Sequence, residues 1–341
     1  MNLPFILALL IAAPAVYLFS ALVCRHAVTL KLIDTPNKRS SHALPTPSGG
    51  GIAIAIVFLL LLVFLSIQPN NYDLLHLAIL GAGTLIALVG FIDDRSHIPA
   101  HKRLLVHFLA AGWVVYCIYI KPISHTSDLY LWVTSLFFMI FLVWLLNLYN
   151  FMDGIDAITS SETITVTLPA AFITWYVVPH DPSWMILLLL VVSTVGFTFW
   201  NLPPAKLFMG DSGSAFLGIV IGALILHTST ISKPLFYAWI ILLGVYLVDA
   251  TVTLIRRLIT GQKIHQAHRS HAYQHAALRF QSHGKVSLVI ALINIVWLMP
   301  AAWAVTMQQI NGPLAITITF TPLIFLAIYF KAGKPQSKDD D

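Results

Sequence analysis

The sequence predicts an all-α membrane protein, a polytopic bundle of about eleven transmembrane helices. Hydrophobic residues make up 58% of the 341 residues and charged residues only 10%, whereas a soluble protein carries about 25% charged residues. The mean hydropathy is +0.84. A spanning helix needs about 20 mostly apolar residues, and eleven segments meet this need, at roughly 4–24, 49–67, 74–92, 104–120, 130–148, 158–178, 183–200, 213–230, 235–255, 286–306 and 313–330.

The basic residues predict how this bundle is oriented. If the eleven segments alternate in direction, 17 of the 19 Lys and Arg residues fall on one side, and only Lys121 and Lys233 fall on the other. Because loops rich in Lys and Arg stay in the cytoplasm, we expect the N-terminus outside and the C-terminus in the cytoplasm. Residues 1–330 are expected to form a single integral-membrane domain, and residues 331–341 a polar cytoplasmic tail.

Composition also limits the classes of function. The net charge of +5 follows from the basic cytoplasmic loops, so it does not call for a nucleic-acid partner. Cys24 and Cys117 both lie in apolar segments, which predicts neither a disulfide framework nor a cysteine-ligated metal. The first segment has no basic start and no clear cleavage site, so we expect a helix rather than a cleaved signal peptide.

Five acidic residues fall at the predicted cytoplasmic ends of apolar segments: Asp93, Asp94, Asp153, Asp156 and Asp211. Carboxylates are costly near lipid, so several on one membrane face predict a shared site. Carboxylate oxygens suit a hard cation beside a phosphate. We therefore expect the function to reside at the cytoplasmic face.

The segment from Asn150 to Asp156 has the most specific pattern. On a helix, Asn150, Asp153 and Asp156 recur at i, i+3 and i+6 and share one face. Such oxygen ligands favour Mg²⁺ or Mn²⁺ over Zn²⁺. A capped helix start is the alternative interpretation of this segment.

The other acidic motifs leave two interpretations each. Asp93 and Asp94 point about 100° apart on a helix, so one is expected near a metal while the other acts as a base or supports a ligand; the alternative is a solvated helix end with a local pair to Arg95. Asp211, in Gly-Asp-Ser-Gly-Ser, is a candidate metal ligand or an N-cap.

Two loops carry candidate anion-binding groups. Gly49, Gly50 and Gly51 open a helix, where free N–H groups can meet a phosphate, and Arg39 and His42 precede them; an ordinary basic turn is the alternative.

The longest internal loop holds His268, Arg269, His271 and His275. We expect phosphate recognition there, with a zinc site or an interfacial basic loop as alternatives.

Together these motifs resemble the polyprenyl-phosphate N-acetylhexosamine-1-phosphate transferase family (glycosyltransferase family 4). The resemblance runs from about Asp34 to His275 and includes the Asp-Asp pair, Asn-x-x-Asp-Gly-x-Asp, Gly-Asp-Ser-Gly-Ser and the histidine loop, in family order. The versions Asp-Thr-Pro-Asn-x-Arg-Ser-Ser-His and His-Arg-Ser-His-Ala-Tyr-Gln look most like the O-antigen-initiating branch. His268-x-x-His271 departs from the consecutive histidines of the muramoyl-pentapeptide enzyme.

The resemblance implies an enzyme of the bacterial inner membrane with its active site facing the cytoplasm. It implies transfer of a sugar-1-phosphate from a UDP-N-acetylhexosamine to undecaprenyl phosphate, release of UMP, and Mg²⁺ as cofactor, with Mn²⁺ as a substitute. A homodimer is compatible with it. The sugar itself stays open between GlcNAc, N-acetylfucosamine and N-acetylquinovosamine.

The resemblance also implies roles for the motif residues. Asp211 would be the main metal ligand, with Asn150 and Asp153 beside it. Asp93 or Asp94 would deprotonate or orient the lipid phosphate, and Phe208 would stack on uracil. The pyrophosphate would be gripped by His268, Arg269 and His271.

Two other classes of function use membrane carboxylates. An ion-coupled transporter needs an ionisable group near the bilayer midplane. Only Asp249 is a candidate for it, and its pairing towards Arg256 or the site is the simpler expectation. An intramembrane aspartyl protease needs Gly-x-Gly-Asp, but Phe208 stands where the first of these glycines would be.

Overall fold

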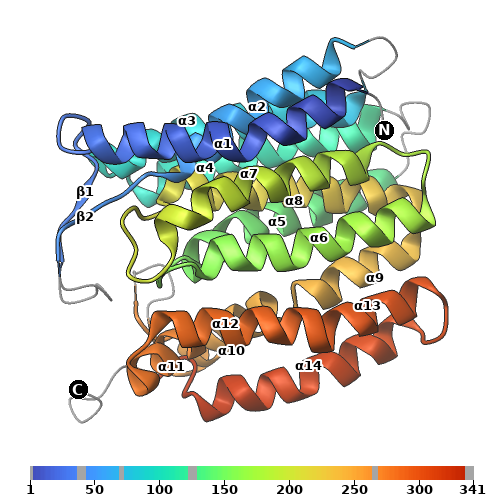
Figure 1. The fold of residues 1–341 in the computed structure, drawn as a ribbon. Helices are drawn as coiled ribbons and strands as arrows, with labels where there is room; N and C mark the ends of the chain where they lie inside the picture. Colours follow the sequence, from blue (N-terminus) through green and yellow to red (C-terminus); the bar gives the residue numbers. More distant parts are fainter. Residues whose placement is uncertain (1–2, 37–43, 69–72, 122–128, 263–267, 335–341) are drawn as a thin grey trace.

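The chain folds into a bundle of long helices lying side by side, with one two-stranded sheet at one end (Figure 1). This computed structural model describes residues 3–36, 44–68, 73–121, 129–262 and 268–334. The strands β1 (Ile33–Asp34) and β2 (Thr46–Pro47) pair antiparallel. The helices are α1 (Leu3–His26), α2 (Gly51–Ser66), α3 (Leu74–Ser96), α4 (Ala100–Val115), α5 (Leu129–Met152), α6 (Ile158–Val177), α7 (Ser183–Asn201), α8 (Asp211–Ile231), α9 (Lys233–Leu242), α10 (Gly244–Ile259), α11 (Ala272–Phe280), α12 (His283–Ile293), α13 (Met299–Thr306) and α14 (Gly312–Tyr329).

An all-α membrane protein is confirmed, but the expected count of eleven spans is not supported. Among the described residues, eight helices are long and apolar enough to cross a membrane, or nine if α9 and α10 are one broken span. These two helices meet at an angle of 68°. Helix α2 has only 16 residues, and α6 begins with four hydroxyl residues and Glu162 between 159 and 163. Two of the eight spans, α4 and α12–α13, are continued through π-helical turns at Tyr116–Ile120 and Asn294–Leu298.

Helix α8 forms the centre of the bundle. Every residue from Ser212 to Leu226 is buried, and the helix packs against α2, α3, α5 and α9. A helix that is apolar all round belongs in such a central position. Its contact with α2 requires glycine on both sides, because a Cβ on Gly51 would lie 2.2 Å from the Cα of Gly213. The fold therefore fixes the start of α8, and with it Asp211, at one end of the bundle.

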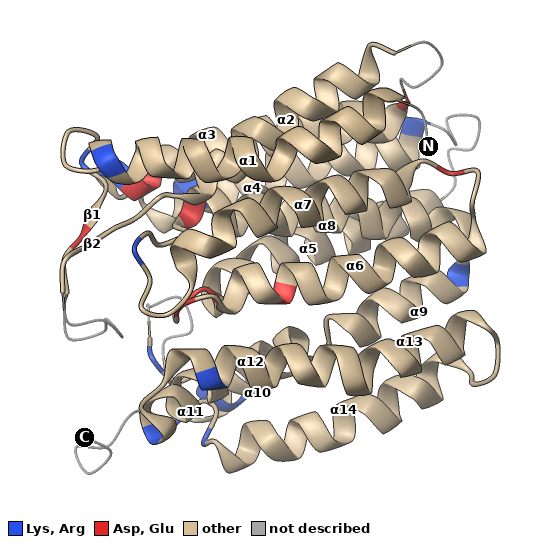
Figure 2. Ribbon diagram, in the orientation of Figure 1, with Lys and Arg blue, Asp and Glu red and all other residues tan. Residues whose placement is uncertain are grey.

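Charged residues gather at the end of the bundle where α3 ends and α8 begins (Figure 2). Lys121, after the π-helical turn that follows α4, and Lys233, at the start of α9, lie at the opposite end. The first residues of the expected tail pack on the bundle: the backbone N–H of Gly333 donates to the Ser270 carbonyl at 2.7 Å, and Ala332 is fully buried. The rest of that tail, 335–341, lies outside the described residues.

Candidate active site

A cavity of about 430 Å³ opens at the charged end of the bundle. Its lining also includes Asp34 of β1, Asn201 of α7 and Gln274 of α11, none of which was among the candidate site residues. His271 is not part of the lining, and Arg39 and His42 lie outside the described residues. The predicted site residues that the cavity brings together are Asp93, Asp94, Asn150, Asp153, Asp156, Phe208, Asp211, His268 and Arg269.

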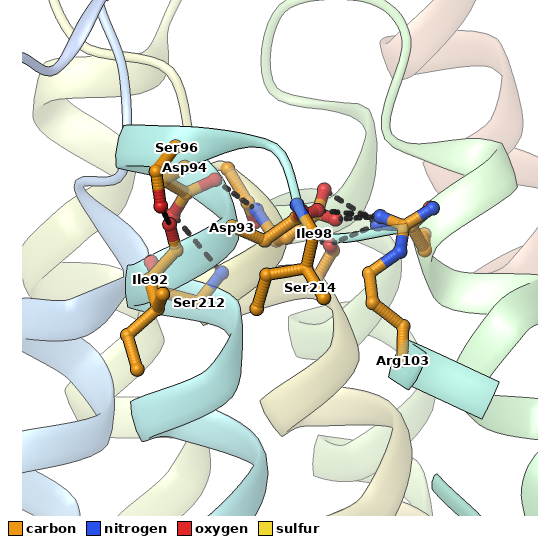
Figure 3. A network of polar contacts seen from close by, with 11 residues as sticks. Ile92, Asp93, Asp94, Ser96, Ile98, Arg103, Ser212 and Ser214 are labelled. Atoms are coloured by element: carbon orange, nitrogen blue, oxygen red, sulfur yellow. Dashed lines mark hydrogen bonds and ion pairs between the residues drawn. The ribbon is translucent and has the colours of Figure 1, made fainter. Parts of the chain in front are cut away.

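One guanidinium ties two of the carboxylates together (Figure 3). Arg103 Nη1 donates to Asp93 Oδ2 at 2.6 Å and to Asp211 Oδ2 at 2.5 Å. The second oxygen of Asp211 accepts a hydrogen bond from Asn150 Nδ2 at 2.7 Å. A single cationic group thus stands between two acids that come from α3 and from the central helix.

Sequence reasoning missed Arg103, which it counted only among the charges that set the orientation. The available signal was its place on the helix that follows the Asp-Asp pair. The alternative of a local pair between Asp93 and Arg95 is wrong, because Arg95 Nε donates to the Leu30 carbonyl at 3.0 Å. Arg95 also lies over the ring of Phe91.

Asp94 makes different contacts from its neighbour Asp93. Its two oxygens accept the backbone N–H groups of Asp211 at 2.7 Å and of Ser212 at 3.1 Å, so it caps α8 from another helix. The N-cap residue of α8 is Gly210, which has no side chain to cap with. The alternative of Asp211 as an N-cap is therefore wrong, and its carboxylate is directed towards Arg103 and Asn150 instead.

The segment from Asn150 to Asp156 is not one continuous helix, contrary to the expectation, but its three polar residues do lie around the same cavity. Helix α5 ends at Met152, so Asp153 and Asp156 lie in the turn that follows, although all three residues line the cavity. Burial raises the pKa of the Asp153 carboxyl to about 7; a hydrogen bond from Thr159 opposes this shift and the charge of Asp94 adds to it.

Asp156 anchors the same turn to two other segments. Its carboxylate accepts a hydrogen bond from the Ala205 N–H at 3.2 Å and pairs with His283 Nδ1 at 3.2 Å. Its carbonyl accepts a bond from the hydroxyl of Ser287 at 2.8 Å. These contacts connect the turn to α12, so Asp156 has a structural task at the edge of the cavity.

Two of the glycines at the start of α2 use their N–H groups within the fold. Gly50 and Gly51 donate their N–H groups to the carbonyls of Phe208 and Met209 at 2.9 and 2.8 Å. The N–H of Phe208 donates to the Pro47 carbonyl at 2.8 Å. The expectation of free N–H groups for a phosphate is thus wrong for these two residues, which instead fix Phe208 in the cavity wall.

The histidine loop splits into residues that face the cavity and residues that do not. His268 and Arg269 line the cavity. Burial lowers the pKa of His268 to about 4, and the nearby His271 and Arg257 act in the same direction, so the ring is neutral at pH 7 and can donate a hydrogen bond but no charge. His271 is only 1% exposed, and its Nδ1 lies 3.2 Å from Asp249 Oδ1.

The zinc and transporter alternatives find no support in this loop. Within the described residues there is no group of three or more His, Cys, Asp or Glu placed to hold a metal ion. Asp249 does not pair with Arg256, whose Nη1 donates to the Ala332 carbonyl at 3.1 Å. His275 Nε2 lies 3.1 Å from the carbonyl oxygen of Lys334.

Comparisons with known proteins find similarity to a family of transferases. The sequence profile of glycosyl transferase family 4 matches residues 76–229. A probable undecaprenyl-phosphate N-acetylglucosaminyl 1-phosphate transferase of Bacillus subtilis is 28% identical, over 95% of this chain and 90% of that protein. An undecaprenyl-phosphate alpha-N-acetylglucosaminyl 1-phosphate transferase of Thermotoga maritima is 26% identical, over 78% and 80%.

A phospho-N-acetylmuramoyl-pentapeptide-transferase of Petrotoga mobilis is 34% identical, over 54% of this chain and 61% of that protein. The family profile covers α3 to α8, which carry Asp93, Asp94, Asn150 and Asp211. The chain is therefore similar to glycosyl transferase family 4, and the relatives that it matches include undecaprenyl-phosphate N-acetylglucosaminyl 1-phosphate transferases.

Proposed function

We propose that this protein transfers an N-acetylhexosamine-1-phosphate from a UDP-sugar to undecaprenyl phosphate and releases UMP. The observation that carries the proposal is the grouping of Asp93, Asp153 and Asp211 with the basic Arg103 and Arg269 around the end of a membrane bundle. The relatives whose names give an undecaprenyl-phosphate acceptor support the lipid substrate. The product would start O-antigen lipopolysaccharide or a related cell-envelope polysaccharide.

The reaction joins two anions. An oxygen of the lipid phosphate attacks the phosphorus that bears the sugar, and the bond from this phosphorus to UMP breaks. Attack of one phosphate on another requires charge neutralisation and in-line positioning of the two groups. Because the acceptor's phosphate lies at the membrane surface, a site at the ends of the helices suits it.

We propose that the cavity binds a divalent cation. Carboxylate and amide oxygens are ligands that Mg²⁺ and Mn²⁺ accept, and Asp211, Asn150 and Asp93 would hold the ion. In the structure the guanidinium of Arg103 supplies the positive charge between Asp93 and Asp211, which is where negative charge is in excess. When bound, the metal neutralises phosphate charge and orients both substrates.

The other residues would bind and orient the substrates. Phe208 offers a ring to the uracil, and Arg269 and His268 offer N–H donors to the pyrophosphate. Asp93 and Asp94 are engaged by Arg103 and by α8, so we assign the removal of the acceptor's proton to Asp153, whose raised pKa suits a base. We favour direct attack over a phospho-aspartate intermediate, because Asp93, Asp94 and Asp211 already have partners.

The orientation is a further part of the proposal. The basic residues at the site end support a cytoplasmic site in the inner membrane. Gln281, exposed in the turn between α11 and α12, and Gln309, exposed before α14 at the opposite end, are suitable probes. In a cysteine-free protein, Gln281→Cys should react with an impermeant reagent only after the membrane is opened, whereas Gln309→Cys should react in intact cells.

One assay tests the transfer and names the donor. Purified protein, undecaprenyl phosphate and Mg²⁺ are incubated with a panel of UDP-N-acetylhexosamines, and UMP is measured. We expect UMP from one donor or a few, and none after EDTA treatment. UMP formation that continues in EDTA would refute the metal requirement, and its absence with every donor would refute the transfer.

A further inference from the structure

Asp249 of α10 is a buried carboxylate to which the proposed reaction gives no role. Its side chain is 7% exposed, and it lies on the second half of the helix pair that bends by 68°. A buried charge is costly unless donors surround it. Four donors do: His271 Nδ1 at 3.2 Å, the N–H groups of Ala272 and Tyr273 at 2.9 and 3.0 Å, and the Thr253 hydroxyl at 3.1 Å.

These contacts make Asp249 the anchor of α11. The first N–H groups of a helix have no partner within it, and for α11 two of them are taken by Asp249. Gln274, in the first turn of the same helix, accepts the N–H of His271 at 3.2 Å and lines the cavity. The position of α11 therefore determines the position of the Gln274 side chain in the cavity wall.

Helix α11 also packs against the turn that carries Asp153. The Tyr273 hydroxyl donates to the carbonyl of Phe151 at 3.0 Å. A Cβ added to Gly154 would lie 2.2 Å from this hydroxyl and 3.0 Å from Gln274 Nε2. Only glycine fits at this point of Asp153-Gly154-Ile155-Asp156, because the hydroxyl of Tyr273 fills the space of the side chain.

We propose that Asp249 is a positioning residue for the transfer. Asp249 itself does not contact the substrates. It holds the N-terminus of α11, and the Tyr273 hydroxyl of α11 then positions the turn of Asp153 relative to the loop of Arg269. The two halves of the cavity are thus held in register by one carboxylate 22 residues before His271. This inference rests on the proposed function, since it concerns the geometry of that site.

The first test replaces Asp249 by Asn, which keeps the size and removes the charge. Donor binding, measured as the Kd of the UDP-N-acetylhexosamine that binds the wild-type protein most tightly, is expected to weaken by about 10- to 100-fold, and kcat to fall by a similar factor. The matched control, Asp181→Asn at the opposite end of the bundle, is expected to leave both values unchanged. Normal Kd and kcat per folded Asp249→Asn molecule would overturn the proposal, whatever the loss of stability.

The second test uses the contact between Gly154 and Tyr273. Gly154→Ala should lower kcat/KM by about 100-fold, while Tyr273→Phe alone should lower it by less than about tenfold. In the double variant the clashing oxygen is gone, so we expect it to recover at least about tenfold over Gly154→Ala. Gly112→Ala is the matched control, because its Cβ would meet only Met139 Sδ at 3.9 Å.

Additive losses in the double variant would overturn the link between α11 and the turn. The tests also separate this inference from the proposed function. If the wild-type protein binds the UDP-sugar but releases no UMP, the transfer fails while the two Kd comparisons still decide the role of Asp249. If it turns over and the variants behave as the controls do, the positioning role alone fails.

Discussion

The two ends of the helical bundle treat their acidic residues differently. At the end opposite the cavity, Asp73 and Asp181 each have a histidine partner, His76 at 2.7 Å and His227 at 2.8 Å. Each also accepts a backbone N–H at the start of a helix, from His76 and from Ser183, both at 2.9 Å. These acids have hydrogen-bond partners within their own helix ends or in a neighbouring helix, and they cap the starts of helices.

At the cavity end the acids outnumber the basic groups that contact them. Asp93 and Asp211 share the single Nη1 of Arg103, Asp94 caps α8, and Asp153 lies beside them with a raised pKa. A fold alone does not need such an excess of negative charge. The comparison teaches that helix-end acids mark a functional site when their charges are left without enough local partners.

The largest expected effect separates the two ends directly. Asp211→Asn removes a carboxylate from the group that surrounds Arg103 and should lower kcat/KM by about 10³-fold or more, the range seen when one electrostatic stabiliser is lost. Asp73→Asn at the opposite end should keep near-normal activity, since Asn is also a good N-cap. Both variants are assayed for UMP release after gel filtration in detergent, and similar activity of the two would remove Asp211 from the site.

Next in size is the loss of a basic group from the cavity wall. Arg269→Ala removes charge-assisted hydrogen bonds to the pyrophosphate, worth about 1.5–3 kcal/mol each, or roughly 10- to 150-fold in kcat/KM for the UDP-sugar. The apparent affinity for the lipid should change less. Arg279→Ala on α11 is the control, because Arg279 lies over the ring of Tyr329 and away from the cavity.

If Arg269→Ala kept normal activity and the purified protein carried stoichiometric zinc, the phosphate-binding role of this loop would be wrong. Metal analysis of the wild-type protein is therefore done alongside the kinetics. The comparison of Arg269 with Arg279 sharpens the difference between basic residues that serve the reaction and those that serve only the membrane orientation.

The pH dependence should show the raised pKa of Asp153. Because burial raises the pKa of this carboxyl to about 7, it is protonated below that pH and cannot accept the proton of the acceptor. We expect kcat/KM to rise about tenfold per pH unit on the acid side and to level off at about pH 7. A flat profile between pH 5 and 8 would exclude Asp153 as the base.

The smallest effect belongs to the opposite end. Although burial raises the pKa of Asp181, the hydrogen bond and charge of His227 hold it below its usual value, so this pair stabilises the fold at neutral pH and the gain is lost as the pH falls below about 4. His227→Gln should lower the free energy of unfolding at pH 7 by about 0.5–1.5 kcal/mol and leave kcat/KM unchanged. Thermal unfolding and UMP release measure the two quantities, and a loss of activity would mean that the ends are coupled.

The sequence predicted an all-α membrane protein, and it brought out many of the residues that line the cavity, because both depend on short patterns. Apolar segments of spanning length are plain in the sequence, and Asp93, Asp153 and Asp211 stand out at their ends. Segment length cannot detect the 68° bend between α9 and α10. Spacing cannot detect the end of α5 at Met152, since residues at i, i+3 and i+6 look helical even where the helix has stopped.

The partners of the site residues could not be predicted in the same way. Arg103 reaches Asp211 across 108 positions, and Asp249 reaches His271 across 22. Both contacts depend on which helices pack together, and α8 becomes the centre of the bundle only in three dimensions. A basic residue at a helix end also has an ordinary explanation in membrane orientation, which hid the role of Arg103.

The cap that Asp94 places on α8 has a consequence for how phosphates are held. The start of a helix carries partial positive charge and often binds phosphate through its own N–H groups. Here the first two N–H groups of the central helix are already taken by a carboxylate, so that permanent dipole is closed to the substrates. In the proposed reaction, the phosphate charge would be met by side chains and an exchangeable cation, and these contacts can break again when the product leaves.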